Sequence, residues 1–137
     1  MYYCLKNKKV LYERITLGKG REAAVLRRHP WIFSGAIASK PENVRSGDIV
    51  EVFSASGDYL CTGFWQKESI AVKVLSFQQQ TLDSAFWTTK LTAALALRQA
   101  LGFTKAGGAY RLVNGEGDFL PGLIIDNYDG YLVLQLH

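Results

Sequence analysis

The chain has 137 residues, 48% of them apolar, and a formal net charge of +4 at pH 7. That is enough apolar material to bury a core in one domain or two small ones. No apolar run approaches the roughly 20 residues needed to cross a bilayer, and no signal-peptide pattern follows the basic start, so we expect a cytoplasmic protein without membrane contact.

Positive charge is concentrated at the start of the chain. Residues 1–28 carry eight Lys and Arg against Glu13 and Glu22, a balance of +6, so residues 29–137 balance at −2. This asymmetry is typical of a polyanion-binding surface, because basic side chains that neutralise phosphates release counterions. A solvated basic tail is the alternative on charge alone, and residues 1–11 are predicted to be a basic extension.

The first predicted unit covers residues 12–78. Strand-forming residues at 12–17 and a Gly-Lys-Gly turn precede a short predicted helix at 21–28, which His29-Pro30 ends because the residue before proline avoids helical angles. An aromatic segment, Trp31-Ile32-Phe33, follows. Further strands are predicted at 49–53, 59–65 and 70–77, and short strands at hairpin spacing favour a small β-barrel.

The second predicted unit covers residues 83–137, after a polar linker at 79–82. A helix is expected at 84–101, capped by Asp83 or Thr81, with one apolar stripe facing a core. The residues of that stripe are Phe86, Trp87, Leu91, Ala94, Leu95 and Leu101.

Three antiparallel strands complete this unit, at 110–114, 123–126 and 131–136, with Asp129-Gly130 as the last hairpin turn. The predicted class is therefore α+β, mainly β. Because the last strand reaches the final residue without a cap or polar tail, we expect further chain downstream and an incomplete second unit.

The turn between the strands at 110–114 and 123–126 is unusually elaborate. Asn114-Gly115 alone could reverse the chain, yet Glu116, Asp118 and further glycines follow. Either the two carboxylates hold neighbouring N–H groups in a glycine-rich loop, or the loop has a binding role. No nucleophile, base or metal partner accompanies the acids in sequence, so acid/base chemistry is not indicated.

Two long phrases carry a family resemblance. Residues 28–37 (RHPWIFSGAI) and 111–126 (RLVNGEGDFLPGLIID), with Gly47-Asp48 and Gly63-Phe64 between them, resemble the bacterial large-subunit ribosomal RNA cytosine-C5 methyltransferase family. The resemblance, from Tyr12 to the end, implies an RNA-binding PUA domain followed by part of a central domain. It also implies that Asn114, Glu116 and Asp118 face the cleft that receives the target cytosine.

The methylating machinery of that family is not recognisable in this chain. No strand leads through a glycine-rich turn into a helix with an acidic residue on the next strand, the pattern that binds a nucleoside cofactor. C5 methylation also needs a cysteine nucleophile, which the family carries downstream. Cys4 and Cys61 match no such motif and have no zinc or disulfide spacing, so plain thiols are expected. We therefore predict a non-catalytic chain without cofactor or metal, whose full-length parent uses S-adenosylmethionine.

The predicted function is RNA docking for this parent, with ribosomal RNA as the partner. Arginine can bridge phosphates, and an exposed aromatic side chain can stack on a base. A core role suits Trp31 better than stacking, however, a turn role is the alternative for His29, and solvated strand positions suit each lysine better than RNA contact. An alternative is a protein-interaction module or homodimer that uses the strand at 131–136. The RNA-binding candidates are Arg21, Arg27, Arg28, His29, Trp31, Lys67 and Lys73.

Overall fold

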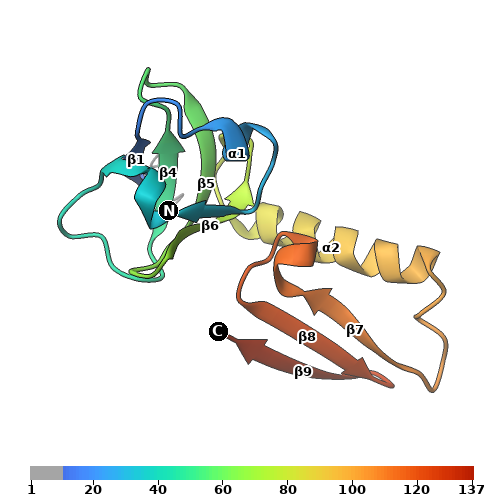
Figure 1. Ribbon diagram of the computed structural model, residues 1–137. Coiled ribbons are helices and arrows are strands. Elements are labelled where there is room, and N and C mark those ends of the chain that lie inside the picture. Colours follow the sequence, from blue (N-terminus) through green and yellow to red (C-terminus); the bar gives the residue numbers. More distant parts are fainter. Residues whose placement is uncertain (1–10) are drawn as a thin grey trace, which may run out of the picture.

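The computed structural model describes residues 11–137, which form a barrel-like unit and a smaller helix-and-sheet unit (Figure 1). Six strands build the first unit, in the order β2-β6-β5-β4-β1-β3. Neighbouring strands are antiparallel except β1 and β4, which run parallel. The strands are β1 (Glu13–Leu17), β2 (Trp31–Phe33), β3 (Ile37–Ser39), β4 (Ile49–Phe53), β5 (Tyr59–Trp65) and β6 (Ile70–Ser76).

The core of the first unit lies inside the curled sheet. Side chains from β1, β4, β5 and β6 fill it, because alternate residues of each strand point inward. On β5 and β6 even consecutive residues are buried, since both faces of these central strands are covered. The fully buried residues include Ile15, Leu17, Val50, Val52, Cys61 and Val72.

The helix predicted at 21–28 is much shorter in the structure. It is a single turn, α1 (Ala23–Leu26), and no side chain caps its N-terminus. The helix ends before Pro30, because Arg28 adopts a left-handed backbone conformation with φ of 63°. A 3₁₀ turn, η1 (Ser34–Ala36), joins β2 to β3.

The predicted long helix is present as α2 (Ser84–Ala100), and Asp83 caps it by accepting a hydrogen bond from the Phe86 N–H at 3.0 Å. The predicted apolar stripe was partly wrong. Phe86 and Ala94 are buried, but Leu91, Leu95 and Leu101 are exposed. The small sheet covers only a narrow face of the helix, and Arg98 is the third buried helix residue.

The second unit packs a three-stranded sheet, β7-β8-β9, beside α2 (Figure 1). Its strands are β7 (Ala109–Asn114), β8 (Leu123–Tyr128) and β9 (Tyr131–Leu136), with a 3₁₀ turn, η2 (Gly115–Asp118), after β7. Asp129 and Gly130 have φ of 50° and 92°, as the predicted tight hairpin requires. The core contains Ala94, Val113, Leu120 and Ile125, whereas all of β9 is exposed.

The predicted α+β, mainly β class is thus confirmed. The segment predicted as a linker, 79–82, is hydrogen-bonded to the barrel, with the Leu82 N–H donating to the Tyr12 hydroxyl at 3.0 Å and Gln80 donating to Ser76 at 2.8 Å. The predicted domain boundaries themselves stay predictions. Across residues 11–137, no helix combines the length and apolar content needed to cross a membrane.

Candidate nucleic-acid interface

The turn after α1 presents three of the predicted RNA-binding residues together. Arg27, Arg28 and His29 follow one another at the end of the helix, and all three are exposed. The Arg27 guanidinium donates to the Ala23 carbonyl at 3.2 Å, and the His29 ring accepts from the Trp31 N–H at 3.2 Å. His29 therefore also has the turn-forming role that the sequence left open. Within residues 11–137, neither arginine forms an ion pair with a carboxylate.

Trp31 lies beside this turn and is half-buried. Its ring meets the His29 ring edge-on with centroids 6.0 Å apart, and its indole nitrogen is buried without a hydrogen-bond partner in the described chain. A hollow of about 440 Å³ is lined by Trp31 and by residues of α1, together with Arg21 and Phe33. Arg21 and Trp31 thus share one side of the barrel.

The two predicted lysines lie in different surroundings. Lys73 is opposite Trp31 in the β2–β6 pairing, and its ammonium is 3.7 Å from the Glu116 carboxylate, which joins the barrel to η2. Lys67 is exposed in the β5–β6 turn, at the other end of the β2–β6 ribbon from Arg28, where its N–H donates to Ser46. Lys67 is therefore apart from the other candidates.

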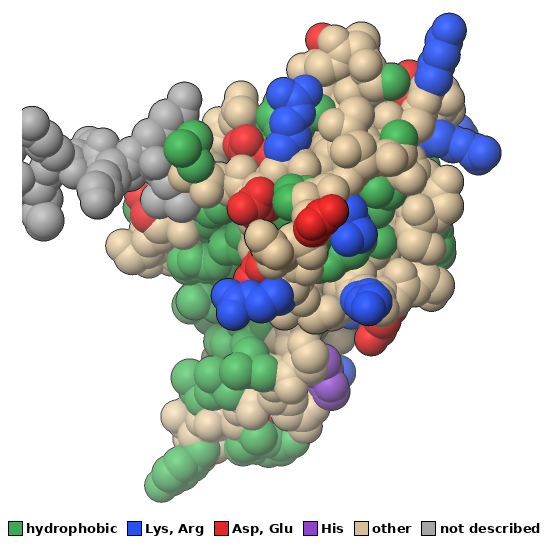
Figure 2. Space-filling view, turned by 90° about the vertical axis from the view of Figure 1, so that its left-hand side faces the viewer, with side chains coloured by type: hydrophobic (Ala, Val, Ile, Leu, Met, Phe, Trp, Pro, Cys, Tyr) green, Lys and Arg blue, Asp and Glu red, His purple; other side chains and the backbone are tan. Residues whose placement is uncertain are grey.

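The basic side chains do not merge into one surface on the face drawn in Figure 2. Lys and Arg appear there as separate groups with Asp and Glu between them, and the lower unit presents a mainly apolar area. Lys6, Lys8 and Lys9, which supply much of the N-terminal charge, lie outside the described residues.

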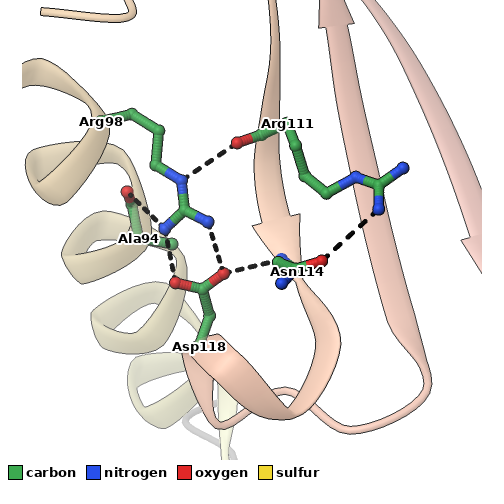
Figure 3. A network of polar contacts seen from close by, with 5 residues as sticks. All are labelled: Ala94, Arg98, Arg111, Asn114 and Asp118. Carbon is green, nitrogen blue, oxygen red and sulfur yellow. Dashed lines mark hydrogen bonds and ion pairs between the residues drawn. The ribbon is translucent and has the colours of Figure 1, made fainter. Parts of the chain in front are cut away.

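The acidic loop has a specific internal structure (Figure 3). Arg98 donates to both Asp118 carboxylate oxygens, with the Nη2–Oδ2 distance 2.7 Å, and to the Arg111 carbonyl at 3.0 Å. Asp118 also accepts from the Asn114 N–H at 2.6 Å. The expectation that a carboxylate holds neighbouring N–H groups is confirmed for Asp118, and Glu116 pairs with Lys73 instead.

Sequence reasoning missed Arg98. Its position four residues after the buried Ala94 places it on the helix face that meets the sheet, and this spacing is the signal that could have found it. A second arginine, Arg111, forms a fork-like pair with Asp126, with nitrogen–oxygen distances of 2.9 and 3.2 Å. That pairing lowers the pKa of the Asp126 carboxyl.

A groove of about 710 Å³ runs between the barrel and α2. Its walls come from four parts of the chain: the turn after α1, the end of β6 with the segment that leads to α2, the helix itself, and the residue after η2. Arg28, Phe77, Lys90 and Phe119 line it. Of these, sequence reasoning had selected only Arg28, because the other three are far apart along the chain.

Among residues 11–137, three non-glycine residues have positive φ, and two of them lie at this groove. Arg28 has φ of 63° and Phe119 has φ of 53°, and the third, Asp129, is in the last hairpin. A left-handed backbone costs such residues about 1–2 kcal/mol each. Strained residues of this kind are concentrated at binding and active sites, so the groove is a candidate site in its own right.

Cys61 is fully buried in the barrel core. Burial raises the pKa of its thiol from 9.0 to about 12, so the thiol carries its proton at neutral pH. This agrees with the expected plain thiol, because the thiolate is the nucleophilic form. Cys4 lies outside the described residues.

Residues 15–77 match the family of PUA-like domains. The fold of these residues is therefore PUA-like. Ribosomal RNA large subunit methyltransferase I of Erwinia tasmaniensis is 42% identical over 125 residues, which cover 90% of this chain and 32% of the relative. The protein of the same name from Klebsiella pneumoniae is 40% identical over 128 residues, covering 92% of this chain and 32% of the relative.

The arrangement of the PUA-like domain and the second unit also occurs in solved structures. A Streptococcus mutans protein assigned as a SAM-dependent methyltransferase matches with a TM-score of 0.71 and 21% identity, over 88% of this chain and 32% of its own. At 21% sequence identity, this structural similarity shows a shared fold. The chain spans about a third of the length of the curated relatives it matches.

Proposed function

We propose that this chain is the RNA-docking, N-terminal part of an S-adenosylmethionine-dependent large-subunit ribosomal RNA methyltransferase that works in the cytoplasm. The observation that carries the proposal is the 42% identity over 90% of the chain with a protein named ribosomal RNA large subunit methyltransferase I. The PUA-like fold supports the docking role, as do Arg27 and Arg28, which are exposed and form no ion pair with any described residue.

The proposed reaction of the parent is methyl transfer to C5 of a cytosine. Support comes from the phrases at 28–37 and 111–126, which resemble those of cytosine-C5 enzymes. Cys61 is unsuited to attack a pyrimidine, because it is buried and its pKa is raised. S-adenosylmethionine and the nucleophile are therefore proposed to belong to parts of the parent outside this chain.

In this proposal Arg27 and Arg28 hold phosphates, and Lys73 and Trp31 extend the contact along β6 and β2. Arginine binds phosphate through paired donors, and neither arginine has to break an ion pair with another residue of the segment 11–137 to do so. The η2 loop with Asn114 and Glu116 lies next to Lys73, so it is proposed to border the same RNA. Arg21 and Lys67 are the outer contacts on the barrel.

The test is binding of this chain to a transcribed large-subunit rRNA fragment between 50 and 200 mM salt. Affinity should fall as salt rises, and R27Q/R28Q should lower the slope of log K against log salt by about 1.4–1.8, or 0.7–0.9 per phosphate contact. Arg45→Gln is the matched control, because Arg45 is exposed but already pairs with Asp48. Undetectable or salt-independent binding would contradict the docking role.

The parent reaction needs a separate measurement. The full-length protein, incubated with S-adenosylmethionine and the same RNA, should yield 5-methylcytidine by mass spectrometry of the digested nucleosides. The chain of 137 residues should yield none. A methylated base other than cytosine would contradict the proposed reaction while leaving the docking role intact.

A second candidate function is association through β9. All six residues of this edge strand are exposed, with Tyr131 at 80% and Leu136 at 81%. Exposed apolar edge strands can pair with another strand. Light scattering tests it: a stable homodimer that Val133→Lys abolishes, together with no RNA affinity, would favour this function over RNA docking.

A further inference from the structure

The groove between the PUA-like domain and α2 combines two cations with a chain of aromatic rings. The Arg28 guanidinium is 5.2 Å from the centre of the Phe77 ring, and the Lys90 ammonium is 5.0 Å from that of Phe119. The Phe77 and Phe119 rings meet edge-on with centroids 6.4 Å apart. Residues from the barrel, the helix and the η2 turn are thus linked in one continuous series.

Both cations lack a carboxylate partner in the part of the chain that the structure describes. Asp83 is the one acidic residue at the groove, and its carboxylate caps α2. Burial also lowers the pKa of the Lys90 ammonium. An anion placed beside Lys90 would offset the cost of that burial.

We propose that this groove binds an unpaired RNA nucleotide, with the base against the Phe119 ring and the flanking phosphates held by Arg28 and Lys90. The inference rests on the proposed RNA-docking function and gives it a specific subsite. Phe119 is 40% exposed, so its ring is available to a ligand although its backbone is fixed. Lys90, Phe77 and Phe119 then act in binding, not only in joining the two units.

The chemistry of the groove favours a nucleotide over a protein segment. Cations beside aromatic rings match a ligand that alternates anionic groups with flat bases, which is the chemistry of single-stranded RNA. The volume of about 710 Å³ lies within the range of roughly 300–1,000 Å³ typical of sites for small ligands. A duplex keeps its bases stacked inside, so it could not offer one to Phe119.

Photo-crosslinking gives a direct test. The probe is a single-stranded octauridylate that carries one 5-iodouridine, irradiated with the intact chain and mapped by mass spectrometry. We expect crosslinks in the peptides that hold Phe119 and Phe77. Crosslinks confined to other residues, or equal capture of the same iodouridine within a duplex, would overturn the proposal.

Affinity measurements with matched variants give the second arm. Phe119→Leu should weaken octauridylate binding by about fivefold or more, as loss of one stacked base does, and Lys90→Gln should lower the salt slope by about 0.7. Phe103→Leu and Lys105→Gln are the controls, because both residues are exposed and lie outside the groove. Lys90→Gln keeps the test available if Phe119→Leu does not fold.

The outcomes separate this inference from the docking function. In one outcome the wild-type chain binds the rRNA fragment and Arg27→Gln weakens this binding, while Phe119→Leu and Lys90→Gln bind like wild type. The proposed nucleotide site in the groove is then overturned, and the docking function stands. If the wild-type chain binds neither the fragment nor the octauridylate, both are overturned. A groove that instead captures a peptide and releases it on Phe119→Leu, without RNA affinity, also overturns the proposal.

Discussion

Arg98 on α2 and Asp118 in the η2 turn form a two-pronged ion pair that is nearly closed to solvent, with side chains 11% and 5% exposed. The remaining donors and acceptors are used as well, since Arg98 donates to the Arg111 carbonyl and Asp118 accepts from the Asn114 N–H. The pair therefore fixes the acidic loop against the helix. It also sets the position of Phe119, the next residue, at the edge of the groove.

Asp118→Asn should strongly destabilise the second unit. The substitution leaves the Arg98 charge buried without a counter-charge, and breaking a buried pair in this way costs about 3–5 kcal/mol. Urea unfolding measures it, followed by tryptophan fluorescence in a Trp31→Phe/Trp65→Phe background that leaves Trp87 as the reporter of the second unit. Arg45→Gln is the control, because its ion pair is at the surface and should leave the midpoint unchanged. Equal midpoints for the two variants would show that the buried pair contributes little.

Glu116→Gln should strengthen RNA binding if Lys73 contacts phosphate. In the free chain the Lys73 ammonium lies 3.7 Å from the Glu116 carboxylate, so an RNA phosphate must compete with that partner. Removing the competing charge should raise affinity for the rRNA fragment by a few-fold at low salt, and the gain should vanish in Lys73→Gln. If the gain in affinity persists in Lys73→Gln, it comes from the loss of a negative charge near the RNA and not from the release of Lys73.

Raising the pH should weaken the PUA-like domain between about pH 9 and 12. Burial raises the pKa of the Cys61 thiol from 9.0 to about 12. Burial is also the largest influence on the Tyr59 hydroxyl, whose pKa is raised from 10.0 to about 12. The unfolded chain therefore releases these protons first, so the stabilisation is complete below pH 9 and is lost as pH approaches 12.

Cys61→Ala isolates the thiol contribution to this pH dependence. The free energy of unfolding of the variant should fall less steeply over the same interval, by up to about 1.4 kcal/mol per pH unit.

In a Cys4→Ser background, Cys61 should also resist a disulfide reagent at pH 8 until urea unfolds the chain. Rapid reaction of the native protein would contradict its burial.

Gly63→Ala should be among the most damaging single methyl additions in the barrel. A Cβ at Gly63 would lie 2.4 Å from the Lys73 carbonyl oxygen, a contact that only a backbone shift can relieve, and 2.8 Å from a Val72 methyl carbon. We expect a loss of at least about 2 kcal/mol in thermal or urea unfolding. Gly35→Ala is the control, since nothing lies within 4 Å of its added carbon. Similar stabilities of the two variants would contradict the close β5–β6 approach.

Much of the fold follows from the sequence because its signals are local. The Asp83 cap, the Asp129-Gly130 turn and the strands β4 to β6 each depend on neighbouring residues, so their positions were predicted closely. The start of the chain shows the limit of such signals. Arg28 leaves the helical region before Pro30 can end the helix, and α1 shrinks to one turn.

Only the tertiary structure decided which distant residues meet. Ordinary helix patterning assigned Leu91, Leu95 and Leu101 to the core, but the three-stranded sheet is too small to cover them, and it buries Arg98 instead. The sequence likewise indicated Arg28 as an RNA-binding candidate. Phe77, Lys90 and Phe119 line the same groove only because the barrel, α2 and the η2 turn meet there. The sequence by itself determined the elements and the charged residue types, because these depend on local spacing. The groove depends on long-range packing, which spacing along the chain does not encode.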